Sequence, residues 1–181
     1  MEERIRKALS RRKAERTVER GLRASAVLIP VYRGNGEYHV LLTERSDEVV
    51  FHKGQVCFPG GTREPSDPTL LQTALRESEE EVGLQAEDVE ILGELDDVPT
   101  FTSNYVISPF VALISHPRSL TTNGREVRGT FCVPLSFLID EANFKQDSLS
   151  YEYNGHVIWG ATARILEQLI GLLKPESGAP Q

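Results

Sequence analysis

A group of glutamates near the middle of the chain has the residue type and spacing of a hard-cation site. Residues 69–82 contain no proline or glycine and fit a helix, and Gly83 is a signal for its end. At about 100° per residue, Glu77, Glu80 and Glu81 fall in one arc of that helix, away from its apolar arc. Like charges at this spacing repel, and a bound Mg²⁺ reverses the repulsion because it takes carboxylate oxygens as ligands. The alternative is a solvated acidic face.

The segment before this helix offers further ligands. Pro59, Gly60 and Gly61 follow a short strand, and the backbone carbonyls of such a turn can join the carboxylates as hard oxygen ligands. We expect the carbonyl of Gly60 or Gly61 in that role. Arg76 falls on a different face of the helix and is expected to hold the helix to the loop through a charge-assisted pair. Because the ligands are oxygens, zinc is disfavoured.

These residues resemble the Nudix box, whose pattern is G-x5-E-x7-R-E-U-x-E-E-x-G-U, where U is an aliphatic residue. The second half of the pattern, from Arg76 onward, carries the match. The gap between Gly61 and Arg76 is one residue longer than in the pattern, and Ser78 replaces an aliphatic residue. The loop glutamate of the pattern has no clear counterpart, and Glu64 and Asp67 are the acids nearby.

The residues before the box are similar to the signature of the coenzyme A pyrophosphatases in the Nudix superfamily, L-L-T-x-R-S-x-x-L-R-x-H-x-G-Q-V-x-F-P-G-G. Residues 41–46 and 52–61 match this signature at the same spacing. Val49 and Val50 stand where the signature has Leu and Arg. With shorter matches elsewhere, the likeness runs from about residue 24 to residue 173, which is most of the chain.

The resemblance implies an α+β protein with the Nudix fold, an α/β/α sandwich around a mixed β-sheet. It implies hydrolysis, dependent on Mg²⁺ or Mn²⁺, of the pyrophosphate bond of coenzyme A or its thioesters to 3′,5′-ADP and 4′-phosphopantetheine or its acyl form. Glu77 and Glu81 are the first choice as metal ligands, with Glu80 third and Gly61 as the backbone ligand. Such a cation would polarise the phosphoryl oxygens and orient the attacking water.

The general base has two candidates, Glu80 on the helix and Glu126 in a loop-like stretch before a strand. The family carries an acid at the position of Glu126, and the alternative is a solvated loop glutamate. Arg76 completes the set assigned to catalysis. Three residues of the matched block are expected to contact the substrate: Arg45, His52 and Gln55. For Arg45 the alternative is an ion pair with a neighbouring acid.

Two other functions stay open at this point. One is a Nudix pyrophosphohydrolase with another substrate, such as a nucleoside triphosphate or ADP-ribose. The other is a non-catalytic Nudix-like module that binds a nucleotide. Retention of Arg76 and three mutually repelling glutamates speaks against the second of these, because a binding module has no need to keep them.

The elements that must position these residues can be predicted from hydrophobic periodicity and turn residues. Strands are expected over 23–32, 37–45, 56–58, 89–95, 106–114, 130–133, 149–153 and 156–159. Helices are expected over 3–20, 69–82 and 161–173, with a short helical turn over 134–140. The chain then divides into a basic helical arm over 1–21, a Nudix domain over 22–174 and a flexible tail over 175–181.

Charge is unevenly distributed along the 181 residues, whose net charge is −7. Residues 1–20 carry +4 and residues 64–97 carry −11. Such concentrated acid is atypical of a nucleic-acid binder, and no stretch of 18 apolar residues indicates a membrane span. We expect a cytoplasmic protein that binds a small nucleotide, with a homodimer through an exposed strand edge as an open question. We expect the basic arm to be a solvated helix, and the alternative is that it approaches the 3′-phosphate of coenzyme A.

Overall fold

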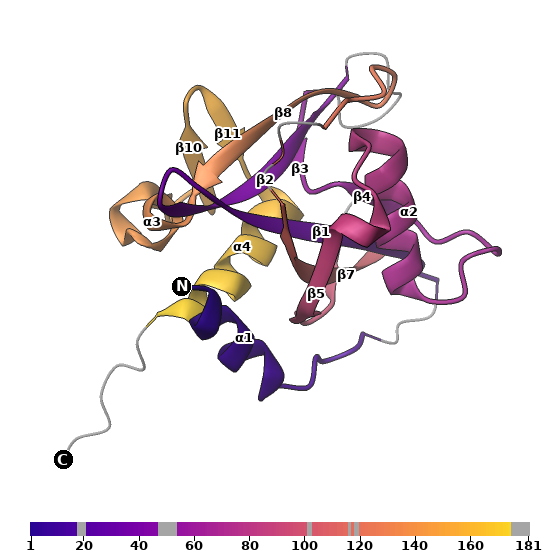
Figure 1. Ribbon diagram of the computed structural model, residues 1–181, viewed down its shortest axis with the longest axis horizontal. Helices are drawn as coiled ribbons and strands as arrows, with labels where there is room; N and C mark the ends of the chain where they lie inside the picture. Colours follow the sequence, from indigo (N-terminus) through magenta and orange to yellow (C-terminus); the bar gives the residue numbers. More distant parts are fainter. Residues whose placement is uncertain (18–20, 47–53, 101–102, 116, 118–119, 175–181) are drawn as a thin grey trace.

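The computed structural model describes residues 1–17, 21–46, 54–100, 103–115, 117 and 120–174 (Figure 1). The helices are α1 (Glu2–Ser10), α2 (Leu70–Val82), α3 (Leu135–Ile139) and α4 (Gly160–Leu173), with 3-10 turns at Ala86–Asp88 and Glu141–Asn143. The strands are β1 (Arg23–Gly34), β2 (Glu37–Arg45), β3 (Val56–Cys57), β4 (Gly60–Thr62), β5 (Val89–Glu94), β6 (Val98–Pro99), β7 (Tyr105–Ile114), β8 (Val127–Pro134), β9 (Phe144–Lys145), β10 (Ser150–Tyr153) and β11 (His156–Ile158). None of the described helices is both long and apolar enough to cross a membrane.

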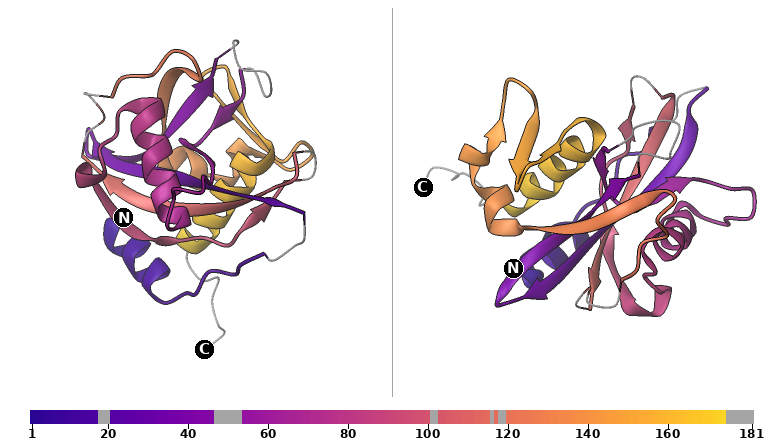
Figure 2. Two further views of the ribbon diagram at one scale, coloured as in Figure 1. Left: turned by 90° about the vertical axis from the view of Figure 1, so that its right-hand side faces the viewer. Right: turned by 90° about the horizontal axis from the view of Figure 1, so that it is seen from above.

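The main sheet has the order β3-β2-β1-β7-β5, with β4 paired to β1, β6 to β7 and β8 to β2. It is mixed, because β1 and β7 run parallel whereas the other pairs are antiparallel. A second sheet has the order β11-β10-β9. Figure 2 shows α2 and α4 on opposite sides of the main sheet. The expected α+β sandwich around a mixed sheet is confirmed.

Alternating residues of β1 serve two cores, as the period of a strand requires. Ala26 and Leu28 belong to the cluster that contains Ala74 of α2. Ile29 belongs to the opposite cluster, which contains Leu166 of α4. The central strand therefore carries a helix on each face, and the position of α2 is fixed by packing on one of them.

Helix α2 begins and ends at signals that the sequence contains. The hydroxyl of Thr69 accepts a hydrogen bond from the backbone N–H of Gln72 (3.3 Å), which is a helix N-cap. Gly83 has φ 70°, and its N–H donates to the carbonyl of Glu79 (2.9 Å). The predicted helix over 69–82 is confirmed. Both ends of the helix are thus fixed, and so are the positions on it from which its glutamate side chains project.

The N-terminal helix ends at Ser10, so the predicted helix over 3–20 is wrong for residues 11–17, and residues 18–20 lie outside the described part of the chain. The reason is the acidic segment that follows β5. The backbone N–H of Glu15 donates to Asp96 (2.7 Å), and that of Thr17 donates to Asp97 (2.9 Å). Carboxylates thus take the donors that a longer helix would use internally.

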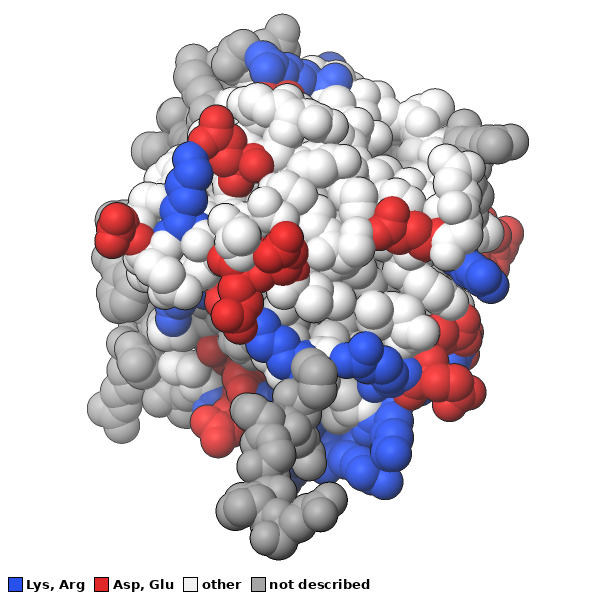
Figure 3. All heavy atoms as spheres, turned by 90° about the vertical axis from the view of Figure 1, so that its left-hand side faces the viewer, with Lys and Arg blue, Asp and Glu red and all other residues white. Residues whose placement is uncertain are grey.

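The arm is also part of the core rather than a solvated helix. Ile5 and Leu9 are 1% and 4% exposed. A Cβ at Gly93 of β5 would lie 2.8 Å from that of Leu9, so this close approach requires glycine. Basic side chains gather on the lower part of the face drawn in Figure 3, and acidic ones lie beside them.

Candidate active site

Three carboxylates converge beside α2. Oxygens of Glu77, Glu81 and Glu126 all lie within 4.8 Å of one another. Glu77 and Glu81 stand one turn apart on the helix, and Glu126 directly precedes β8. Glu81 is buried (2% exposed), Glu77 is half-buried and Glu126 is exposed. The group is therefore rooted in the protein interior and open to solvent on one side.

Two glycines of β4 make room for this group. A Cβ on Gly61 would lie 2.5 Å from Oε1 of Glu77, and a Cβ on Gly60 would lie 2.6 Å from the Cα of Val27 in β1. Gly60, with φ 152°, donates its N–H to Oε2 of Glu81 (3.1 Å). Only residues without a side chain permit so close an approach of strand and carboxylates.

Crowding and burial disfavour the charged forms of the helix carboxylates. Burial raises the pKa of Glu81 to about 8, and the neighbouring carboxylates of Glu77 and Glu126 add to the rise. The Gly60 N–H and the Arg45 guanidinium oppose it. Burial also raises the pKa of Glu77, against the opposing effect of Arg76. When these carboxylates are ionised, the protein supplies too little positive charge to balance them. A hard divalent cation, which takes oxygen ligands, would supply that charge.

Glu80 does not join this group, which corrects the expected convergence of three helix glutamates. Its side chain is 58% exposed, and its carboxylate accepts from Nη1 of Arg76 at 3.4 and 3.5 Å. Arg76 thus contacts Glu80 as well as Glu77, and Glu80 lies on the solvent side of that arginine. Glu126, from a distant part of the sequence, occupies the third place instead.

Arg76 connects the helix to the loop, as its place on the helix suggested. Its guanidinium donates to both carboxylate oxygens of Asp67 at 3.0 Å, to the carbonyl of Thr62 (3.2 Å) and to Oε1 of Glu77 (3.0 Å). It therefore orients the Glu77 carboxylate while holding the loop after β4. Asp67 also accepts from the Thr73 hydroxyl (3.0 Å). Of the two acids near the position of the loop glutamate in the pattern, Glu64 and Asp67, it is Asp67 that pairs with Arg76.

The segment before β8 is held against the end of α2 by Asn123, which the sequence did not single out. The Asn123 N–H donates to the carbonyl of Glu81 (3.1 Å). Its Oδ1 accepts from the backbone N–H groups of Glu126 (3.0 Å) and Val127 (3.3 Å). The carbonyl of Glu126 accepts from Ser46 (2.8 Å). The Asn-Gly pair at 123–124 was the available signal for a turn here.

Arg45, the last residue of β2, and Gln55, the residue before β3, lie side by side. The Arg45 N–H donates to the carbonyl of Gln55 (3.0 Å), and Arg45 pairs with Val127 across β2 and β8. Nε of Arg45 is buried without a hydrogen-bond partner among the described residues. A guanidinium N–H without a described partner, on a side chain whose charge acts on Glu81, is a donor for a ligand that the protein does not itself supply. His52 lies outside the described residues.

Comparison with known proteins decides the family. The NUDIX domain family matches residues 22–149, more than half of the chain. The chain belongs to the NUDIX domain family. It is 38% identical over 157 residues to the Nudix hydrolase NudL of Photorhabdus laumondii, which is 81% of this chain and 83% of that protein. It is 35% identical over 179 residues to Nudix hydrolase 3 of Caenorhabditis elegans, which is 84% of this chain and 74% of that protein.

The fold agrees with this membership. The NUDIX domain of Shewanella oneidensis NrtR, solved as a complex with ADP ribose, superposes with a TM-score of 0.61. The match covers 86% of this chain and 91% of that one at 18% identity, so it speaks for the fold alone. The family match and the Nudix hydrolase relatives together make the chain a Nudix hydrolase. This class acts on nucleoside diphosphate derivatives and generally uses divalent metals.

Proposed function

We propose that this Nudix hydrolase cleaves the pyrophosphate bond of coenzyme A or its thioesters, with Mg²⁺ or Mn²⁺ as cofactor. The products would be 3′,5′-ADP and 4′-phosphopantetheine or its acyl form. The observation that carries the hydrolytic part is the convergence of Glu77, Glu81 and Glu126 within 4.8 Å. The substrate assignment rests on residues 41–46 and 52–61, which match the coenzyme A signature at the same spacing.

In this proposal each residue has a separate task. Glu77 and Glu81 hold the cation, and the Gly61 carbonyl is a further ligand. Bound there, a divalent cation neutralises diphosphate oxygens and lowers the pKa of a coordinated water. Arg45 donates from its unsatisfied Nε to a phosphate oxygen, and Gln55 lies next to it. Arg76 is a positioning residue, because its contacts orient Glu77 and fix the loop.

Glu126 is the proposed general base. It is exposed, it lies in the carboxylate group, and its backbone is held on both sides, which suits a side chain that must reach a water. The water loses its proton to this carboxylate as its oxygen attacks phosphorus. The bond from that phosphorus to the bridging oxygen breaks, and the bridging oxygen leaves with the other phosphate.

One assay tests the proposal. Purified protein is incubated with Mg²⁺ and, separately, coenzyme A, ADP-ribose and a nucleoside triphosphate, and the products are resolved by chromatography. Release of 3′,5′-ADP from coenzyme A, with little turnover of the other two, is the expected result. Turnover confined to ADP-ribose or the triphosphate would overturn the substrate assignment. Absence of turnover of all three substrates, both with Mg²⁺ and when Mn²⁺ replaces it, would overturn the hydrolytic proposal.

A further inference from the structure

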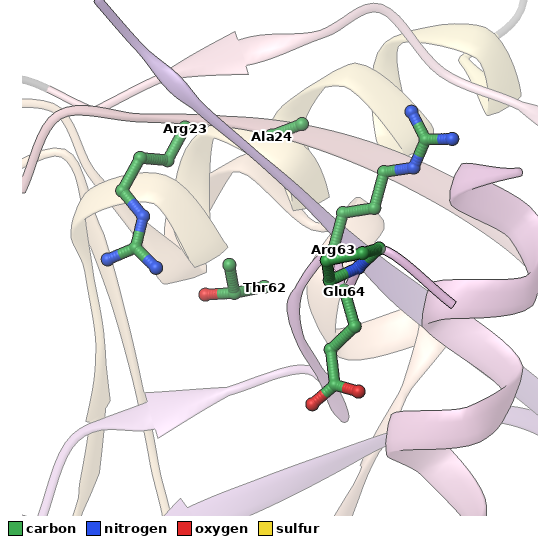
Figure 4. A pocket seen from close by; sticks show the side chains of 6 residues that line it. Arg23, Ala24, Thr62, Arg63 and Glu64 are labelled. Carbon is green, nitrogen blue, oxygen red and sulfur yellow. The ribbon is translucent and has the colours of Figure 1, made fainter. Parts of the chain in front are cut away.

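Strand alternation decides which side chains near the site reach α2. Ala26 of β1 packs in the cluster of α2, so Arg23, three residues earlier, lies on the opposite face of the sheet. Thr62 pairs with Ser25 and shares that opposite face. Figure 4 shows the Arg23 guanidinium and the Thr62 hydroxyl at a hollow on this face, with the Arg63 guanidinium directed away from them. β1 and β4 thus keep a regular alternation, and the hollow lies apart from the carboxylate group.

Strand β8 breaks this alternation next to the site. Its pairing with β2 is regular up to Glu44, which lies opposite Gly129, but the next residue, Arg45, lies opposite Val127. One step along β2 is therefore matched by two steps along β8, and Arg128 is the extra residue. This is a β-bulge, a feature that re-aims the side chains of a strand.

The bulge moves the start of β8 onto the face of α2. Phe131 and Val133 lie on the face of α4, and regular alternation would place Val127 there as well. Val127 instead is fully buried in the cluster of α2, which also contains Val82, the last residue of that helix. The extra residue therefore determines which helix the beginning of β8 packs against.

The position of Glu126 follows from the shifted pairing. The Ser46 N–H donates to the carbonyl of Glu126 (2.8 Å), which continues the register in which Arg45 lies opposite Val127. Without the extra residue, Ser46 would lie opposite Val127, and Glu126 would be displaced along β2 by one residue, about 3.3 Å. A carboxylate that must approach a water within hydrogen-bond distance would not tolerate that displacement. The bulge is therefore a condition for Glu126 to join the carboxylate group.

An ion pair spans the bulge. Nη2 of Arg128 donates to Oε1 of Glu44 (2.6 Å), so the extra residue of β8 is bound to the last residue of β2 before the shift. Nδ1 of His156 lies 3.8 Å from the other carboxylate oxygen of Glu44, and its ring stacks on that of Phe131 with 4.1 Å between the centroids. The side chains of Glu44 and Arg128 are 16% and 52% exposed, so the pair adds little to overall stability. Its effect is local, on the choice between two pairings of the same strands.

We infer that the ion pair between Glu44 and Arg128 holds the bulge of β8 and thereby places Glu126 in the carboxylate group. Both are positioning residues, because they act through Glu126 and not on the substrate. The functional part of this inference rests on the proposed function, in which Glu126 is the general base. Loss of the pair lets β8 shift toward the regular register, which withdraws the base while Glu77 and Glu81 keep their places on α2.

A double-mutant cycle tests the inference with whichever of the three substrates the wild-type protein cleaves. We expect Arg128→Gln to lower kcat about tenfold with KM within twofold of wild type, and Arg128→Lys, which keeps the charge, to restore most of the rate. In a Glu126→Gln background, Arg128→Gln should change kcat less than twofold, because the residue through which it acts is already gone. Lys145→Gln is the matched control, since it removes another ion pair between strands, with Glu152 in the second sheet, and should keep kcat within twofold of wild type.

Hydrogen exchange provides a readout that does not depend on catalysis. The N–H groups of Glu126 and Val127 donate to Oδ1 of Asn123 in the shifted pairing. We expect their exchange rates, measured by nuclear magnetic resonance, to rise at least fivefold in Arg128→Gln, because the segment opens more often. The same rates should stay within twofold of wild type in Lys145→Gln.

The outcomes separate this inference from the proposed function. If Glu126→Gln lowers kcat, then an unchanged kcat in Arg128→Gln, an equal loss in Lys145→Gln, or losses that multiply in the double variant would each overturn the inference. If Glu126→Gln leaves kcat unchanged, or no substrate is cleaved, the proposed function fails at that point, and the exchange rates alone decide whether the pair holds the bulge. Unchanged exchange in Arg128→Gln would overturn the inference in either case.

Discussion

Arg76 and Asp67 form a two-pronged ion pair, in which Nε donates to Oδ1 and Nη2 donates to Oδ2, both at 3.0 Å. Asp67 is 5% exposed and receives further hydrogen bonds from Thr73 and from the N–H of Glu64 (2.9 Å). The pair joins the loop after β4 to α2 and leaves Nη2 in contact with Glu77 (3.0 Å). The geometry of the carboxylate group thus depends on a residue that does not belong to it.

Asp67→Asn is predicted to destabilise the protein by about 2 kcal/mol and to lower turnover about tenfold, because it leaves a half-buried guanidinium without its charge partner. The Arg76 guanidinium holds the pKa of Asp67 well below its usual range. The native state therefore binds fewer protons here, and the stability from Asp67 is present above about pH 4 and lost as pH falls. Acid unfolding followed by circular dichroism checks this. A variant whose acid midpoint equals that of wild type would contradict it.

Gly61→Ala should separate metal binding from folding. A Cβ would stand 2.5 Å from Oε1 of Glu77, so the carboxylate must move. We expect Mn²⁺ affinity, measured by calorimetry, to fall at least tenfold. Gly129→Ala on β8 is the matched control, because a Cβ there meets nothing within 4 Å. Equal affinities in the two variants would show that the close approach of Gly61 has no part in the site.

Asn123→Ala removes the acceptor that holds the N–H groups of Glu126 and Val127. We predict a fall in kcat of about tenfold with KM within twofold of wild type, because the base is displaced while the other substrate contacts stay. Asn123→Asp keeps an acceptor oxygen and should restore most of the rate. Steady-state kinetics on all three proteins decide the matter, and a variant in which only KM changes would contradict the positioning role.

Glu81 gives the metal-free protein a characteristic pH dependence. Burial raises its pKa from 4.5 to about 8, so between these values the native state holds a proton that the unfolded chain has released. Stability should therefore fall as pH rises from about 4.5 to about 8. Glu81→Gln should remove most of that slope in urea titrations with EDTA. Glu79→Gln, an exposed neighbour on α2, should keep it. An unchanged slope in Glu81→Gln would show that another group is responsible.

Helical periodicity predicted the two members of the carboxylate group that lie on α2. Glu77 and Glu81 are four residues apart, and caps fix both ends of that helix. The same wheel placed Glu80 beside them, whereas in the structure its carboxylate is exposed and lies outside the group, because a wheel gives directions from an axis and not the conformation of a long side chain. Local spacing could thus identify the helix but not resolve competition between neighbouring pairs.

Contacts between residues far apart in the sequence could not be predicted and became visible only in the structure. Glu126 entered the sequence argument only through family resemblance, since nothing local brings it to α2. Asn123 makes that contact, and its side chain bonds to the backbone in a way that sequence pattern does not specify. The arm was predicted as a helix because its residues favour one, and the carboxylates of Asp96 and Asp97 displaced that preference through contacts about eighty residues away. In each case tertiary contacts outweighed local propensity.

The central claim is that Glu77 and Glu81 hold a divalent cation and Glu80 does not. Its most direct test is Mn²⁺ binding followed by electron paramagnetic resonance in wild type and in Glu77→Gln, Glu81→Gln and Glu80→Gln. The account predicts bound Mn²⁺ in wild type, at least a tenfold weaker affinity in Glu77→Gln and Glu81→Gln, and a change below twofold in Glu80→Gln. Absence of bound Mn²⁺ in wild type, or an equal loss in Glu80→Gln, would contradict it.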